Sequence, residues 1–230
     1  MASSTQKNDN GKVLKWIIFP SLFISFIGLF IIPELRLAFA LYFGMSIWSV
    51  NAYRQKEYQE EIYGIKQGFL EFIFIKYPAG IIGGIFFLFI SSLIPAFSLL
   101  TPTLSLSVAE DIRGFIIIIM APYIEEPWRA ATLGYLRDIY KISFAKANVI
   151  QSLGFGAIHV LVYGLAFGAY DKWVDVYGGF AAISGSLAAA VVFGLISGYV
   201  MERKKDITYS LAGHQTINFW LFNEGLVAVA

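Results

Sequence analysis

Three ionisable side chains stand inside one apolar stretch of the chain, in the segment APYIEEPWRA. They are Glu125, Glu126 and Arg129. A charge in the middle of a bilayer costs at least about 2.5–3.5 kcal/mol on insertion scales, so such residues mark functional sites by default. The two histidines of the chain, His159 and His214, also lie within long apolar stretches. Carboxylates and imidazoles together can move protons, activate water or bind a metal ion.

The depth of these groups in their helices predicts that they meet. At 1.5 Å per residue, Glu125, His159 and His214 lie about 14–20 Å from the basic residues that end their helices. The three side chains are therefore expected at a similar level, in the half of the membrane reached from the cytosol. Glu125 and Arg129 are four residues apart, so they share a helix face and can pair. Pro127 lacks a backbone N–H and is expected to kink this helix.

Each of these residues also has a purely structural interpretation. The acidic pair and Arg129 could form a buried salt bridge that fixes helix packing. A single histidine in a membrane helix commonly forms an interhelical hydrogen bond, and Asn218, one turn after His214, could do the same. Two carboxylates, two histidines and an asparagine at one depth instead favour a hydrolytic or metal-binding site.

The composition predicts the elements that hold these residues. Of 230 residues, 57% are hydrophobic and 14% are charged, whereas soluble domains have about 45–50% and 25%. The chain is also rich in aromatic residues, which suit lipid contact and membrane interfaces. The net charge of +1 provides no general attraction to nucleic acid. Because the chain has no cysteine, disulfides, thiolate metal sites and thiol nucleophiles are excluded.

Hydropathy predicts an all-α, polytopic transmembrane helix bundle with about seven spans and a cytosolic N-terminus. Residues 1–15 are expected to form a disordered cytosolic tail, and residues 16–230 a single transmembrane domain. A polar stretch at 51–67 is predicted to lie on the membrane surface as an amphipathic helix. This topology places thirteen Lys and Arg residues inside and three outside, as the positive-inside rule expects. The predicted spans are residues 16–32, 37–50, 77–100, 112–136, 147–167, 179–201 and 210–229.

The motifs on the last helices resemble those of the CAAX-protease and bacteriocin-processing (CPBP, or Abi) family of intramembrane endopeptidases. That family has Glu-Glu-x-x-x-Arg, Phe-x-x-x-His and His-x-x-x-Asn on successive membrane helices. Here the second motif is Phe155-Gly-Ala-Ile-His159 and the third is His214-Gln-Thr-Ile-Asn218. The first motif, Glu125-Glu126-Pro-Trp-Arg129, is one residue shorter. The resemblance covers about residues 110–225.

The resemblance implies the following roles, in an endopeptidase that acts on a membrane-associated, prenylated or precursor peptide substrate. Glu125 would activate the water molecule, and His159 would help to hold or deprotonate it. His214 and Asn218 would face the carbonyl oxygen as it becomes an oxyanion. Substrate binding or orientation of the site is implied for Glu126, Arg129 and Phe155.

The need for a metal ion is left open by the sequence. Glu125, His159 and His214 could supply three zinc ligands and leave one position for water. The same residues could equally catalyse hydrolysis without a metal, by a mechanism in which the glutamate activates water. The expected partners are a peptide or membrane-protein substrate and the lipid bilayer, with no nucleic acid. The plasma membrane is the expected location, with the site reached from the cytosolic side.

Two other functional classes compete with this interpretation. A non-catalytic scaffold or bacteriocin-immunity protein with the same fold is favoured somewhat by the short first motif. In an ion-coupled transporter the Glu/His cluster would act as a proton relay. No inverted repeat is visible in the sequence, which argues mildly against a transporter.

Overall fold

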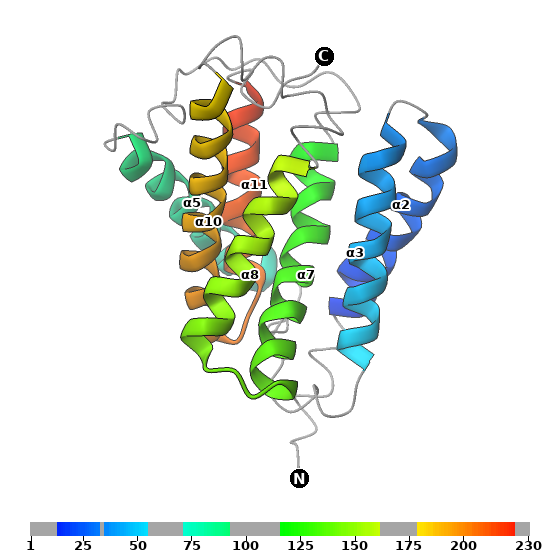
Figure 1. Ribbon diagram of the computed structural model, residues 1–230, viewed down its shortest axis with the longest axis horizontal. Helices are drawn as coiled ribbons and strands as arrows, with labels where there is room; N and C mark the ends of the chain where they lie inside the picture. The colour runs from blue at the N-terminus through cyan, green and yellow to red at the C-terminus, as the bar shows by residue number, and fades with distance from the viewer. Residues whose placement is uncertain (1–12, 33–34, 55–70, 93–115, 162–178, 224–230) are drawn as a thin grey trace.

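The computed structural model describes residues 13–32, 35–54, 71–92, 116–161 and 179–223 (Figure 1). Within these ranges the chain forms helices and no strand, which confirms the predicted all-α class. Most of the predicted N-terminal tail lies outside the described residues. So do residues 55–67 of the predicted surface helix, and the ends of several predicted spans.

In the part of the chain that the structure describes, seven helical rods follow one another in the predicted order. Three of them contain π-helical turns, labelled η, at one or both ends of a regular α-helix. The first begins at Leu14, so the last residues predicted for the tail already belong to a helix. The rods are η1 (Leu14–Ile18) with α2 (Phe19–Ile31), α3 (Arg36–Arg54), η4 (Phe72–Lys76) with α5 (Tyr77–Ser92), η6 (Ile116–Met120) with α7 (Ala121–Gly134) and η7 (Tyr135–Ile139), α8 (Phe144–His159), α10 (Gly179–Lys204) and α11 (Thr208–Asn223).

The membrane character of the bundle shows on its outside. Large apolar side chains are exposed there, among them Phe30 at 67%, Phe74 at 72% and Ile82 at 68%. Such exposure suits contact with lipid rather than water. By length and hydropathy, Leu14–Ile31 is the one spanning candidate among the described residues, with a mean hydropathy of 2.0, and Phe74–Phe89 is a shorter apolar helix. The number of spans therefore stays a prediction.

Helix α7 lies at the centre of the bundle (Figure 1). It packs against α3 on one side and against α8, α10 and α11 on the other. The closest other pairs are α2 with α3, α8 with α10, and α5 with α11, and α10 also contacts α11. A cluster of buried apolar side chains closes one end of the bundle. It includes Ile17, Tyr53, Leu133, Met201 and Leu211 from five of the seven rods.

Glycines bring α5 and α11 into backbone contact beside His214. A Cβ added at Gly84 would lie 2.7 Å from the Gly213 carbonyl oxygen, and one added at Gly80 would lie 2.8 Å from that of Tyr209. Close approach through small residues is the usual way in which membrane helices associate. This seam between α5 and α11 fixes the helix that carries His214.

Two adjacent glycines of α5 provide a matched test of this seam. We expect Gly84→Ala to lower the midpoint of thermal unfolding in detergent, because the new Cβ has no space and overpacking typically costs about 1–3 kcal/mol. Gly83→Ala is the control, since nothing lies within 4 Å of a Cβ at Gly83. Helix propensity alone would make both changes stabilising. Equal midpoints for the two variants would contradict the seam.

The two glycines of α8 differ in how closely a neighbouring helix approaches them. A Cβ at Gly156 would lie 2.7 Å from Val191 and 2.8 Å from Leu187 of α10, so this glycine allows α8 and α10 to approach closely. A Cβ at Gly154 would meet only Trp128, at an ordinary contact distance of 3.6 Å. Gly154 is therefore not a point of close helix approach.

Candidate active site

Helix α7 carries the acidic pair, and it runs as a regular α-helix through Pro127. The proline leaves the carbonyl of Tyr123, four residues earlier, without its helical donor. The Ser21 hydroxyl of α2 lies 3.5 Å from this oxygen and donates to it. A side chain from a neighbouring helix thus replaces the missing N–H, as irregularities inside membranes require. The π-helical turns lie at the two ends of α7 and not at Pro127.

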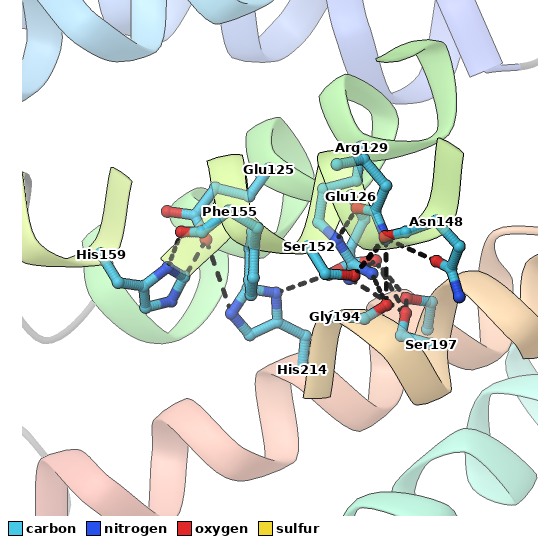
Figure 2. A network of polar contacts seen from close by, with 12 residues as sticks. Glu125, Glu126, Arg129, Asn148, Ser152, Phe155, His159, Gly194, Ser197 and His214 are labelled. Carbon is cyan, nitrogen blue, oxygen red and sulfur yellow. Dashed lines mark hydrogen bonds and ion pairs between the residues drawn. The ribbon is translucent and has the colours of Figure 1, made fainter. Parts of the chain in front are cut away.

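Glu125, His159 and His214 meet in one place, as their depths predicted (Figure 2). Glu125 Oε2 lies 3.8 Å from His159 Nε2 and 3.5 Å from His214 Nε2. The Glu125 and His214 side chains are buried, and that of His159 is 14% exposed. The three ligand atoms lie within 4.8 Å of one another. Side chains from α7, α8 and α11 therefore share a single small site.

The hydrogen bonds on the far side of each imidazole fix its tautomer. His159 Nδ1 lies 3.0 Å from the carbonyl oxygen of Phe155, and His214 Nδ1 lies 2.8 Å from Glu126 Oε1. A carbonyl or an ionised carboxylate only accepts hydrogen bonds, so each Nδ1 carries the proton and donates it. Each neutral ring then turns an Nε2 lone pair toward Glu125.

Three acceptors consequently surround one point. Glu125 Oε2 is buried and has no hydrogen-bond partner among the described residues. Two imidazole lone pairs face the same oxygen, and none of the three atoms can satisfy another without a proton between them. The arrangement fits a proton, the hydrogens of a water molecule or a metal ion at its centre.

Arg129 pairs with Glu126 and not with Glu125, which corrects the pairing expected from their spacing. Arg129 Nη1 lies 2.8 Å from Glu126 Oε1, and both side chains are fully buried. Residues three apart are helix neighbours just as residues four apart are. The Glu125 carboxylate points instead toward the two histidines (Figure 2).

The Glu126–Arg129 pair belongs to a wider buried network. The guanidinium donates to side-chain or backbone oxygens of α8 and α10 and lies 4.5 Å from the Phe155 ring centroid. Ser210 of α11 donates to Glu126 Oε2. The carboxylate that orients His214 is thereby held from three helices. The oxygens that accept from Arg129, apart from those of Glu126, belong to Gln151, Gly194 and Ser197.

Of the other predicted residues, Phe155 packs beside this network and Asn218 is buried on the helix that carries His214. Phe155 is fully buried, with its ring 4.2 Å from that of His159 and 5.5 Å from that of His214, measured between centroids. It packs against both imidazole rings and against the Arg129 guanidinium, and so supports the site by packing. Asn218 is 5% exposed and lies one turn after His214 on α11.

Four buried polar residues of the site are absent from the sequence prediction. Gln151, Ser197 and Ser210 support the buried network, and their signal was a polar side chain inside an apolar span. Tyr42 of α3 donates to Glu125 Oε1 at 3.3 Å. A tyrosine in an aromatic-rich membrane helix carries no such signal.

A family model matches the part of the chain that holds these motifs. Residues 110–220 match the family described as type II CAAX prenyl endopeptidase Rce1-like. The family resemblance predicted from the sequence is confirmed over this segment. Members of the Rce1-like family are integral membrane proteases, so the match supports a protease here. No curated protein and no solved structure matches the chain significantly.

Proposed function

We propose that the chain is an intramembrane endopeptidase in which Glu125 activates the attacking water. The observation that carries this proposal is the convergence of Glu125 Oε2 with the Nε2 atoms of His159 and His214. A water at this point can donate to the carboxylate and to one imidazole. Its oxygen is then held with a lone pair free for attack on a peptide carbonyl.

The reaction follows from the same atoms. Glu125 takes a proton from the water as the water oxygen bonds to the carbonyl carbon. The developing oxyanion is stabilised by the Asn218 amide, while the unprotonated Nε2 of His214 can accept a hydrogen bond from the attacking water. The protonated Glu125 then returns its proton to the leaving nitrogen as the peptide bond breaks. Glu126 keeps the His214 ring in place throughout, because it accepts from Nδ1.

The short first motif is compatible with this chemistry. With two residues between them, Glu126 and Arg129 still form a buried pair, and the Arg129 donors reach α8 and α10. The spacing therefore gives little support to a scaffold without catalytic function. The substrate class proposed is a membrane-associated peptide, such as a prenylated tail or a precursor, and the proposed access is from the cytosolic face of the plasma membrane.

A metal ion also fits the donor set. The residues that would hold it are Glu125, His159 and His214, which offer one carboxylate oxygen and two imidazole nitrogens. Both rings already donate their other N–H to an oxygen, as zinc-bound histidines do. A bound Zn²⁺ would supply Lewis acidity and a more acidic water. Glu126 would keep its role of orienting His214 in either case.

Cleavage by the purified protein tests the proposal. We expect wild type in detergent to cut members of a peptide library that includes prenylated CAAX-type and unmodified sequences. His159→Ala should lower the rate at least about 100-fold, because a general base or water-holding group contributes 10²–10⁴-fold. Each protein is assayed with and without a strong chelator, and the chelated samples are also assayed after zinc is added back.

The chelator decides between the two mechanisms. Cleavage that survives chelation supports a glutamate mechanism, and cleavage that is lost and then restored by zinc supports a metalloprotease. Absence of cleavage by a folded wild type across the library would contradict the proposal and favour the scaffold. An unchanged rate in His159→Ala would remove this histidine from the mechanism.

A further inference from the structure

We infer that Tyr42 is a positioning residue that fixes the Glu125 carboxylate, supplied by a helix outside the segment that matches the family. The hydroxyl of Tyr42 lies 3.3 Å from Glu125 Oε1, and its side chain is fully buried. Tyr42 stands on α3, whereas the family match begins at residue 110. The catalytic meaning of this contact depends on the proposed function, but the contact itself does not.

The direction of the hydrogen bond follows from the chemistry of the two groups. An ionised carboxylate only accepts, so the phenol O–H is the donor. Its bond occupies Oε1, while Oε2 faces both histidines. The two oxygens of a carboxylate are chemically equivalent and exchange places by rotation about the terminal bond. A donor held on one of them therefore selects which oxygen faces the site and in what plane.

Helix α3 is held in place by its own contacts. It packs tightly on α2, where a Cβ added at Gly28 would overlap the Phe39 ring. Helix α2 in turn reaches α7 through the bond from Ser21 to the Tyr123 carbonyl. The α2–α3 pair is thus bonded to α7 at Tyr123 and again at Glu125, two residues further along. Both bonds come from buried side chains, so this pair can hold the phenol at a fixed height beside the carboxylate.

It follows that the matched segment alone lacks one part of the site. The histidines and the Glu126–Arg129 network all lie within residues 110–220, but the donor to Glu125 Oε1 does not. The first two helices therefore supply a hydrogen-bond donor to Glu125, in addition to residues of the apolar cluster at one end of the bundle. Their contribution is a single O–H group, which one substitution can remove without changing the ring that packs around it.

The test compares Tyr42→Phe with Tyr53→Phe in the full chain. Tyr53 is a buried tyrosine of the same helix that belongs to the apolar cluster at one end of the bundle. Infrared difference spectra of the two folded variants are recorded, and the carboxyl band that Glu125→Gln removes is taken as the band of Glu125. We expect Tyr42→Phe to shift this band and Tyr53→Phe to leave it in place.

Kinetics supply the second measurement. Loss of a hydrogen bond to a charged group should lower kcat about tenfold in Tyr42→Phe, with KM within about twofold of wild type. A rise in KM alone, or an equal loss in Tyr53→Phe, would overturn the positioning role. So would an unshifted Glu125 band. A shifted band in a protein that cleaves no peptide would refute the proposed function and leave Tyr42 as the residue that holds Glu125.

Discussion

Replacement of Glu125 by glutamine is expected to lower kcat by about 10³-fold or more, with the protein still folded. The amide keeps the shape of the side chain and can still accept from Tyr42 through its oxygen. It cannot take a proton from water, and its NH₂ group can donate to the imidazole nitrogens. The step that generates the nucleophile is therefore lost while the packing of α7 is retained. Single-turnover cleavage of the best library peptide measures the effect.

Glu71→Gln is the matched control for this change. Glu71 has a side chain that is 47% exposed, and it stands beside Lys76 at the start of the rod that contains α5. The same change of acid to amide is expected to leave kcat within about twofold there. Cleavage that persists in Glu125→Gln would rule out the glutamate as the base. If the protein is a scaffold, Glu125→Gln should still bind its partner. If it is an ion-coupled transporter, Glu125→Gln should lose ion-coupled transport.

Replacement of Arg129 by methionine is expected to destabilise the protein by about 3–5 kcal/mol, because it leaves a buried carboxylate without its partner. Arg129 is fully buried, and oxygens of Glu126, Gln151, Ser197 and Gly194 accept from it. Methionine fills much of the same volume, so the loss arises mainly from the uncompensated charge of Glu126. Unfolding in detergent, followed with a denaturant titration, measures the change.

Two further variants separate charge from packing. The double variant Glu126→Gln/Arg129→Met removes both charges and should recover much of the lost stability, since the new amide oxygen can still accept from His214. Arg137→Met is the less buried control, because Arg137 pairs with the partly exposed Asp138 and Glu202 near the end of its rod. Partly exposed pairs contribute about 0–1 kcal/mol. A double variant no more stable than Arg129→Met would show that packing dominates.

The sequence predicted the helix order and the meeting of three side chains, because each depends on one strong signal. Apolar runs located the seven rods, and the depths of Glu125, His159 and His214 placed them at one level. Helix ends were less predictable, since the π-helical turns extend or shift them without any change in hydropathy.

The contacts around the site could not be predicted in the same way. Glu125 and Glu126 both lie within about one turn of Arg129, so spacing alone could not select its partner. Arg129 pairs with Glu126 because α8, α10 and α11 surround these two side chains with polar groups. Tyr42 lies 83 positions before its partner in the chain. Only the packing of α3 on α7 brings the two together.

The two histidines reach the site on helices that have different closest neighbours. Helix α8 packs chiefly on α10, and α11 chiefly on α5, while α7 contacts helices of both pairs. Membrane helices insert individually and associate afterwards. Neither pair contains both histidines, and neither contains Glu125. A newly made chain would therefore acquire its proposed hydrolytic capacity only with the final association of its helices, so that partly assembled molecules in the bilayer would be harmless to their neighbours.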